Sequence, residues 1–326
     1  MKVAVTGAAG FVGTNLVNLL VEQGNEVVAI DRAQPENETR AQVTWLNVNI
    51  LEEQQLEAAF QGVDVVYHLV AMITLAHHDE LAWRINTEGV RNVAEAALAA
   101  GVRRMVHCSS IHSFDQYACG GNIDENSPRS TDDDLPVYDR SKFAGEQELR
   151  AVIDKGLDAV VCNPTAVYGP VDKAPLSRIN GILRDAARGR VPAFVEGGFD
   201  FVDVRDVAEG LVLAGEKGRT GENYLITGQF LPMVQVCRIA ARLNGRRGPL
   251  FAVPLKVLSA IVPIAEPICK IFNSDVITKA SVGALESSPL VDGSKAQAEL
   301  GYTPRDTDST IRDLISHFVT SGQLQR

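Results

Sequence analysis

The first thirty residues constrain the fold more than any other stretch of the chain. A short apolar run from Lys2 to Thr6 leads directly into the glycine-rich turn Gly7-Ala8-Ala9-Gly10-Phe11-Val12-Gly13, and residues 14–23 carry apolar side chains at helical spacing. A second apolar run, 26–30, ends in Asp31. Strand, glycine turn, helix, strand and acid, in this order, form the sequence pattern of a dinucleotide-binding unit.

Each glycine of this turn has its own physical task. Gly7 allows the tight turn, Gly10 lets the backbone approach a pyrophosphate, and Gly13 lets the helix lie near the strand. The helix N-terminus offers unpaired N–H groups and a partial positive charge to the phosphates, and Asp31 is placed to accept hydrogen bonds from an adenosine ribose. The cofactor contacts predicted in this unit are Gly7, Ala9, Gly10, Phe11, Val12, Gly13, Asp31 and Arg32.

Strand-like and helix-like segments alternate as far as residue 170. Strands are expected near 43–46, 63–69, 105–108 and 159–162, and helices over 52–60, 83–100 and 138–152. This alternation predicts an α/β fold, a doubly wound parallel sheet of the Rossmann type with helices on both faces. Residues 1–170 are expected to form the dinucleotide-binding core with the catalytic helix. The alternation loosens in residues 171–326, which are expected to form a smaller α+β lobe that mainly binds substrate and returns some segments to the core.

The composition of the 326 residues argues against some classes of partner. The formal net charge is −10 and the isoelectric point is about 5.2, whereas nucleic-acid binding requires basic patches. The five cysteines are scattered without a C-x-x-C motif, and His77 and His78 are adjacent in an expected loop. We interpret them as reduced thiols and solvated histidines. We therefore expect no nucleic acid, no metal site and a cytoplasmic location.

Residues 250–272 form a long apolar stretch that needs a separate interpretation. Pro254, Pro263 and Pro267 interrupt it, and charged residues lie inside it, which makes it a poor membrane-spanning helix. We expect a broken helical cover over an apolar pocket, with contact to a membrane surface as the weaker alternative.

Tyr138 and Lys142 lie four residues apart in a segment expected to be helical, so a phenol and an ammonium share one helix face. A free phenol has a pKa of about 10, too high for efficient proton transfer at neutral pH, and a nearby lysine lowers it by favouring the phenolate. The same ammonium can hold the hydroxyls of a nicotinamide ribose. Ser110, at the end of an expected strand, can orient a substrate carbonyl and stabilise negative charge.

Several short motifs occur in the order found in one enzyme superfamily. They are Thr6–Gly13 (TGAAGFVG), His68–Ala71 (HLVA), Asn86–Gly89 (NTEG), Ser109-Ser110, Tyr138–Lys142 (YDRSK), Pro164, Val167–Pro170 (VYGP), Phe201–Ala208 (FVDVRDVA) and Lys295–Pro304 (KAQAELGYTP). Over nearly its whole length the chain resembles the extended short-chain dehydrogenases/reductases, the superfamily of NAD-dependent epimerases and dehydratases. The resemblance implies that Tyr138 is the catalytic acid–base, Lys142 its partner and Ser110 the hydroxyl that orients the substrate.

The resemblance also implies further cofactor contacts. Asn86 is expected as a structural helix residue near the site, and Asn49 stands where family members often carry an adenine-binding Asp. Asp31 favours the free 2′-hydroxyl of NAD and repels a 2′-phosphate, whereas Arg32 offers that phosphate a partner. We therefore expect NAD, with NADP as the alternative. The expected contacts outside the glycine unit are Asn49, Ile50, Leu69, Val70, Ala71, Asn86, Tyr138, Lys142, Pro164 and Val167.

Two departures from the family pattern bear on the substrate. Ala166 stands where nucleotide-sugar enzymes usually carry an Asn, and Phe199 where they commonly carry a basic residue, and both usual residues help to hold the nucleotide or its diphosphate. The stretch 163–165 (NPT) instead resembles the dihydroflavonol-reductase-like and hydroxysteroid-dehydrogenase-like branches, which act on less polar carbonyls or alcohols. We therefore favour carbonyl/alcohol oxidoreduction of a small apolar substrate. The expected substrate contacts are Met72, Ser110, His112, Asn163, Thr165 and Phe199.

Two alternatives stay open at this point. An NAD-retaining nucleotide-sugar epimerase or dehydratase uses the same catalytic residues and returns its hydride. A non-catalytic dinucleotide-sensing protein of the same fold need not keep Tyr138 and Lys142, and this chain keeps both. Relatives often dimerise through helices that correspond to residues 83–100 and 138–152, so we expect a homodimer.

Overall fold

The computed structural model describes residues 1–33, 39–173, 175–257 and 289–325. Its centre is a seven-stranded sheet in the order β11-β7-β5-β4-β1-β2-β3, and every neighbouring pair in it is parallel. The strands are β1 (Lys2–Thr6), β2 (Glu26–Ile30), β3 (Val43–Leu46), β4 (Val65–His68), β5 (Arg104–Cys108), β7 (Ala159–Pro164) and β11 (Asn223–Ile226). The expected α/β class and doubly wound sheet are confirmed.

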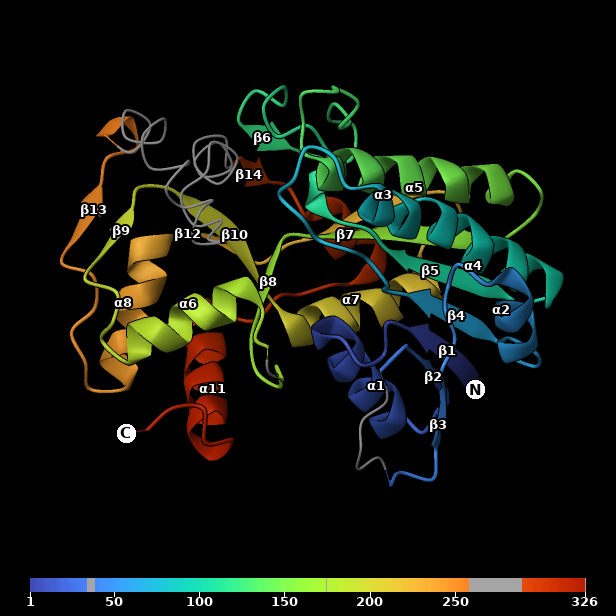
Figure 1. Cartoon of the computed structure of the whole chain (residues 1–326), viewed down its shortest axis with the longest axis horizontal. Helices are drawn as coiled ribbons and strands as arrows, with labels where there is room; N and C mark the ends of the chain where they lie inside the picture. The colour runs from blue at the N-terminus through green and yellow to red at the C-terminus, as the bar shows by residue number, and fades with distance from the viewer. Residues whose placement is uncertain (34–38, 174, 258–288, 326) are drawn as a thin grey trace.

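Helices cover both faces of this sheet, as Figure 1 shows. One face carries α1 (Phe11–Glu22) and α7 (Val204–Lys217), and the other carries α2 (Glu53–Ala59), α3 (Glu80–Asn86), α4 (Glu88–Ala99) and α5 (Val137–Ile153). Side chains alternate between the two layers along each strand, because successive residues of a strand point to opposite faces. Val3 and Val5 belong to the core under α1 and α7, whereas Ala4 belongs to the core under α2, α4 and α5.

A second lobe lies beside the carboxyl ends of the strands (Figure 1). Its core is formed by α6 (Arg178–Ala187), α8 (Met233–Leu243) and α11 (Thr307–Thr320) with Phe201 of β10. Small sheets complete it: β8 (Ala166–Tyr168), β10 (Gly198–Asp203) and β12 (Gln229–Pro232) form one, and β9 (Ala193–Val195) pairs with β13 (Phe251–Val253). Two short segments, β6 (Asn122–Ile123) and β14 (Leu290–Val291), pair above the sheet. The division near residue 170 stays a prediction, and β11 and α7 belong to the large sheet and its layer.

The helix expected over 83–100 is instead two helices that meet at Thr87. Thr87 has φ −117° and ψ −71°, and its hydroxyl donates to the carbonyl of Trp83 at 2.8 Å. A β-branched side chain that hydrogen-bonds back to the preceding turn bends a helix. This break directs α3 toward the loop after β4 while α4 stays on the sheet.

Most of the apolar stretch 250–272 lies outside the described residues. The part within them begins with β13 and continues to residue 257. Among the helices that the structure describes, none combines the length and the apolar character needed to span a membrane.

Candidate active site

The glycine turn lies at the point where the strand order reverses. β2 and β3 lie on one side of β1, while β4, β5, β7 and β11 lie on the other. The amide of Gly7 donates to the carbonyl of Ile30 at 2.9 Å, and the amide of Leu69 donates to the carbonyl of Thr6 at 3.1 Å. Because crevices at such switch points are where open α/β sheets bind ligands, this end of the sheet is the candidate active site.

Three glycines of the turn are required by sterics, because a Cβ on any of them would come close to main-chain atoms. Gly7 has φ +75°, and a Cβ there would lie 3.0 Å from the amide nitrogen of Val70. A Cβ on Gly10 would lie 3.2 Å from the carbonyl oxygen of Gly7, and one on Gly13 only 2.0 Å from the same oxygen. The turn is therefore a close-packed backbone cradle that opens onto the N-terminus of α1. Such a cradle fits the pyrophosphate of a dinucleotide.

Asp31 holds the cradle to the end of β2. Its carboxylate accepts hydrogen bonds from the amides of Ala9 at 3.0 Å and Ala33 at 3.2 Å. The side chain thus points back over the turn, where the ribose of a dinucleotide would lie. Arg32, the candidate partner of a 2′-phosphate, is exposed beside it.

Tyr138 and Lys142 lie on α5, and Ser110 lies just beyond β5. The hydroxyl of Ser110 lies near the phenol of Tyr138 and favours its ionised form. The ammonium of Lys142 is buried and donates to the carbonyl of Cys108 at 3.1 Å. The parallel sheet explains this convergence: β5 delivers Ser110 to its carboxyl end, and α5 crosses the same end one layer above.

The protonation of this trio differs from what the sequence suggested. Burial raises the pKa of Tyr138 above its ordinary value, and the nearby hydroxyl of Ser110 partly opposes that increase. Burial also lowers the pKa of Lys142 to about 8. Lys142, expected to lower the pKa of Tyr138, is not among the groups that lower it here. At neutral pH the phenol is therefore protonated and able to donate.

Two buried histidines lie beneath Lys142 on neighbouring strands. His68 and His107 are cross-strand partners whose rings stack, with their centroids 5.3 Å apart and an interplanar angle of 18°. The hydroxyl of Thr6 lies 2.7 Å from Nδ1 of His68. Within the described part of the chain, Nε2 of His68 and both ring nitrogens of His107 have no hydrogen-bond partner. Burial, with the nearby charge of Lys142, lowers the pKa of His68 to about 3 and that of His107 well below its usual range.

Comparison with known proteins identifies the family. The model of the NAD dependent epimerase/dehydratase family matches residues 3–227. The chain is 31% identical to sterol demethylase protein B of Methylococcus capsulatus, over 99% of this chain and 100% of that protein. It is 30% identical to a candidate dihydroflavonol 4-reductase of Synechocystis sp., over 98% of this chain and 95% of that protein. The chain belongs to the NAD-dependent epimerase/dehydratase family.

The solved structures agree with this assignment. The crystal structure of gox2253 superposes with a TM-score of 0.85 at 30% identity and covers 99% of both chains. More distant relatives include the 3-beta-hydroxysteroid dehydrogenase of Mycolicibacterium neoaurum, which is 26% identical over 97% of this chain. The chain is therefore an extended short-chain dehydrogenase/reductase, and the predicted enzyme class and superfamily are confirmed.

The remaining predicted cofactor residues lie at or just beyond the carboxyl ends of β3, β4 and β7. Leu69, Val70 and Ala71 follow β4 directly, beside the glycine turn. Asn49 accepts from the amide of Leu51 at 3.2 Å, and Ile50 is buried. Pro164 ends β7 and is buried, and Val167 is half-buried in β8.

Asn86 links the loop after β4 to α5. Its amide exchanges hydrogen bonds with the backbone of Met72, at 2.8 and 3.0 Å, and donates to the hydroxyl of Ser141 at 2.9 Å. The helices approach closely there, because a Cβ on Gly145 would lie 2.1 Å from the carbonyl oxygen of Asn86. Asn86 therefore holds the loop after β4 against α5 by hydrogen bonds within the protein. Met72 is half-buried beside it.

Sequence reasoning missed a buried polar network behind Ser110, centred on Glu146 of α5. Glu146 is fully buried, accepts from the hydroxyl of Ser109 at 2.6 Å and forms an ion pair with Arg129. It also accepts from the amides of Asn163 at 2.8 Å and Asn223 at 3.0 Å. Its position one helical turn beyond Lys142 was the available signal, since residues four apart share a helix face.

Asn163 and Thr165 are expected to contact the substrate, and in the structure their polar groups are hydrogen-bonded within the protein. Asn163 is fully buried, and its amide also donates to the carbonyl of Ser110 at 3.0 Å and the hydroxyl of Ser113 at 3.0 Å. The hydroxyl of Thr165 donates to Asp200 at 2.6 Å. These hydrogen bonds favour positioning roles for Asn163 and Thr165. Phe199 remains half-buried, edge-on to Phe201.

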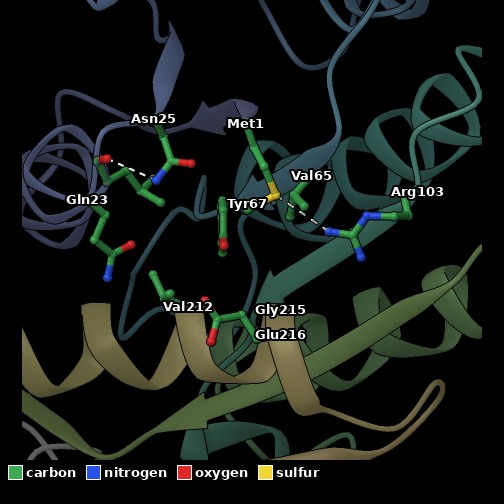
Figure 2. A pocket seen from close by; sticks show the side chains of 10 residues that line it. Met1, Gln23, Asn25, Val65, Tyr67, Arg103, Val212, Gly215 and Glu216 are labelled. Atoms are coloured by element: carbon green, nitrogen blue, oxygen red, sulfur yellow. Dashed lines mark hydrogen bonds between the residues drawn. The ribbon is translucent and has the colours of Figure 1, made fainter.

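A pocket of about 280 Å³ lies at the opposite end of the sheet. Figure 2 shows Met1, Val65 and Arg103 around it, at the amino ends of β1, β4 and β5, with Glu216 of α7 below. None of its lining residues belongs to the predicted site, and the glycine turn faces the other way.

Proposed function

We propose that the chain transfers a hydride between a nicotinamide dinucleotide and the carbonyl or alcohol carbon of a small apolar substrate. The observation that carries the proposal is the convergence of Ser110, Tyr138 and buried Lys142 at the end of the sheet that carries the glycine cradle. The nicotinamide, when bound, supplies the hydride acceptor or donor.

The protein residues have separable tasks in this reaction. Tyr138, protonated at neutral pH, donates its proton to a carbonyl oxygen that becomes an alcohol and takes it back in the reverse direction. Ser110 holds the same oxygen and stabilises negative charge on it. Lys142 holds positive charge beneath them, near the position expected for the nicotinamide ribose. Asn163 and Glu146 keep the backbone and side chain of the Ser109-Ser110 pair in place.

Two observations support an apolar substrate. Two relatives, at 31% and 30% identity, carry the names sterol demethylase protein B and candidate dihydroflavonol 4-reductase, and both names refer to ring compounds without a nucleotide. Phe199 packs edge-on against Phe201, with ring centroids 6.1 Å apart, where nucleotide-sugar enzymes commonly carry a basic residue. We infer that NAD is the preferred cofactor, because Asp31 lies over the turn, with NADP as the alternative.

The family model also supports a second candidate, an NAD-retaining epimerase or dehydratase that acts on a nucleotide sugar. It would use Tyr138, Lys142 and Ser110 in the same way and would show no net change in the cofactor. A homodimer formed through α4 and α5 and a cytoplasmic location remain part of the proposal.

Absorbance at 340 nm separates the two candidates. Purified protein is supplied with NAD⁺, NADP⁺ or their reduced forms and with dehydroepiandrosterone, dihydroquercetin, 5α-androstan-3-one or UDP-glucose. Net cofactor turnover with an apolar probe that Tyr138→Phe lowers by about 10²- to 10⁴-fold supports the oxidoreductase. Conversion of UDP-glucose without net turnover rejects it in favour of the epimerase.

Lysine variants provide a matched control. Lys142→Met removes the buried ammonium, whereas Lys155→Met removes an exposed ammonium that pairs with Glu95 at 2.8 Å just after the same helix. We expect the first to lose turnover and the second to keep it. Equal activity of both variants would contradict the role assigned to Lys142.

A further inference from the structure

His112 lies beside the catalytic tyrosine, and the proposed oxidoreduction gives it no task. Its ring meets that of Tyr138 edge-on, with centroids 5.4 Å apart. His112 belongs to the 3-10 turn Ile111–Ser113. Ser110 caps this turn, because its hydroxyl accepts a hydrogen bond from the amide of His112 at 3.2 Å. Its side chain is 36% exposed, whereas its partner Asp139 is 12% exposed. A titratable ring therefore lies at the rim of the site, two residues after Ser110, the hydroxyl proposed to hold the substrate oxygen.

A carboxylate fixes the orientation of this ring. Nδ1 of His112 lies 3.1 Å from Oδ1 of Asp139, which follows Tyr138 on α5. A carboxylate can only accept, so Nδ1 carries the proton and Nε2 keeps its lone pair. The side-chain nitrogen of Gln116 lies 3.2 Å from the same Nδ1. Because amide oxygen and nitrogen are assigned from the hydrogen-bond network, we assign the Gln116 amide the reversed orientation, in which its oxygen also accepts from Nδ1. Nε2 is the atom of the ring left available to a ligand among the described residues.

We propose that His112, oriented by Asp139, is a second acid–base group of this site and moves a proton at the carbon next to the carbonyl carbon. This inference rests on the proposed function, because it needs a ketone bound through Ser110 and Tyr138. It adds an activity, reversible enolisation of the ketone, to hydride transfer.

The step balances without any further reagent. Nε2 of neutral His112 removes a proton from the carbon next to the carbonyl, and the electrons of that C–H bond form a carbon–carbon double bond. The π electrons of the carbonyl move onto its oxygen, which takes the proton of Tyr138 while Ser110 stabilises the charge. The reverse step returns the proton from imidazolium to the same carbon or, in an unsaturated ketone, to a carbon conjugated with it.

The electrostatics of the pair suit this task. Burial lowers the pKa of His112, whereas the charge and the hydrogen bond of Asp139 raise it, and the net result is a raised pKa. Asp139 and Tyr138 are the titratable groups in contact with the ring. The same carboxylate stabilises the imidazolium that forms when Nε2 takes a proton.

Hydrogen–deuterium exchange tests the step separately from hydride transfer. The full-length protein is incubated with NAD⁺ and 5α-androstan-3-one in D₂O, where no hydride can be donated, and deuterium in the ketone is measured by mass spectrometry. Reduction of the same ketone by NADH is measured at 340 nm. We expect enzyme-dependent exchange, and we expect His112→Asn to lose at least tenfold more exchange than reduction, because asparagine can keep the bond to Asp139 but provides no base.

Two further variants sharpen this test. Asp139→Asn should move the inflection of exchange against pH to lower pH, since it removes the charge that raises the histidine pKa, and a purely structural role would not move it. His78→Asn, in an exposed loop, should leave exchange and reduction unchanged.

The outcomes separate this inference from the proposed function. Reduction without exchange above the enzyme-free rate overturns the role of His112 and leaves the oxidoreductase standing, as does undiminished exchange in His112→Asn. Absence of both reduction and exchange, with UDP-glucose converted, overturns both.

Discussion

The proposed site has a cofactor half, shaped by main-chain atoms, and a substrate half, shaped by buried side chains. In the cofactor half, main-chain atoms pack so closely that a Cβ on Gly7, Gly10 or Gly13 would lie 3.0, 3.2 or 2.0 Å from one of them. In the substrate half, buried side chains shape the site, and Glu146 is bonded to four residues far from it in sequence: Ser109, Arg129, Asn163 and Asn223. We therefore expect the cofactor half to be sensitive to an added side-chain carbon, and the substrate half to the loss of a hydrogen-bonding partner.

This difference shows which half of the site can be predicted from local sequence. A backbone cradle depends on conformational freedom and close approach within about thirty residues, and glycine is the residue that provides both. A polar network depends on groups far apart in sequence, because a buried charge is costly unless each of its partners is present. Four predictions test the contrast, beginning with the largest expected effect.

Removing the charge of Glu146 should break the substrate half. Glu146→Gln leaves the guanidinium of Arg129 without its carboxylate, and breaking a buried pair costs about 3 to 5 kcal/mol in the free energy of unfolding. Glu148→Gln on the same helix is the control, because its partner Arg91 lies 3.7 Å away on the surface; we expect a change below about 0.5 kcal/mol. Urea denaturation measures both, and equal losses would refute the contrast.

Adding one carbon should break the cofactor half. Gly13→Ala places a Cβ 2.0 Å from the carbonyl oxygen of Gly7, so the turn must shift. We expect a loss of about 3 kcal/mol of stability and of NADH binding measured by fluorescence. Gly181→Ala, in α6 with open space around it, should instead gain about 0.5 to 1 kcal/mol. Normal NADH binding by Gly13→Ala would contradict the steric account.

The stacked histidines should make the junction of the two halves sensitive to acid. Both have folded-state pKa values below the ordinary value of 6.5, so the unfolded state binds more protons below that pH. Their neutral burial is therefore tolerated above about pH 6.5, and each costs about 1.4 kcal/mol of stability per unit as the pH falls well below it. His107→Phe should flatten the stability curve between pH 6.5 and 5 and leave its shape above pH 7 unchanged. Parallel curves from urea denaturation would count against this.

Asp31 should tune the cofactor half without breaking it. Asp31→Asn keeps an oxygen for the amide of Ala9 but removes the charge that repels a 2′-phosphate. We expect affinity for NADPH relative to NADH to rise about tenfold, roughly 1.4 kcal/mol, by isothermal titration. Glu26→Gln, at the other end of β2, should leave that ratio unchanged, and an unaltered ratio in Asp31→Asn would assign the preference elsewhere.

Much of the fold could be predicted from the sequence, and the errors have physical causes. The catalytic helix was expected over 138–152 and runs over Val137–Ile153, because its apolar spacing is regular. The helix expected over 83–100 is broken, because the bend at Thr87 depends on a hydroxyl that bonds back to Trp83, which composition does not reveal. The sequence also did not reveal that the amide of Asn163 bonds to Glu146 and Ser113, which lie far from it in the chain; its expected contact with the substrate stays a prediction.

The sequence by itself determined the parallel α/β sheet, the cradle between β1 and α1, and the spacing of Tyr138 and Lys142. These are local patterns, set by residue period, glycine and helical geometry within one or two elements. Only the tertiary structure decided the burial of Glu146 with Arg129, the stacking of His68 on His107 and the contact of His112 with Tyr138. Those depend on which strands become neighbours and which helix crosses their ends, and the energy of a buried polar group is decided by partners distant in sequence.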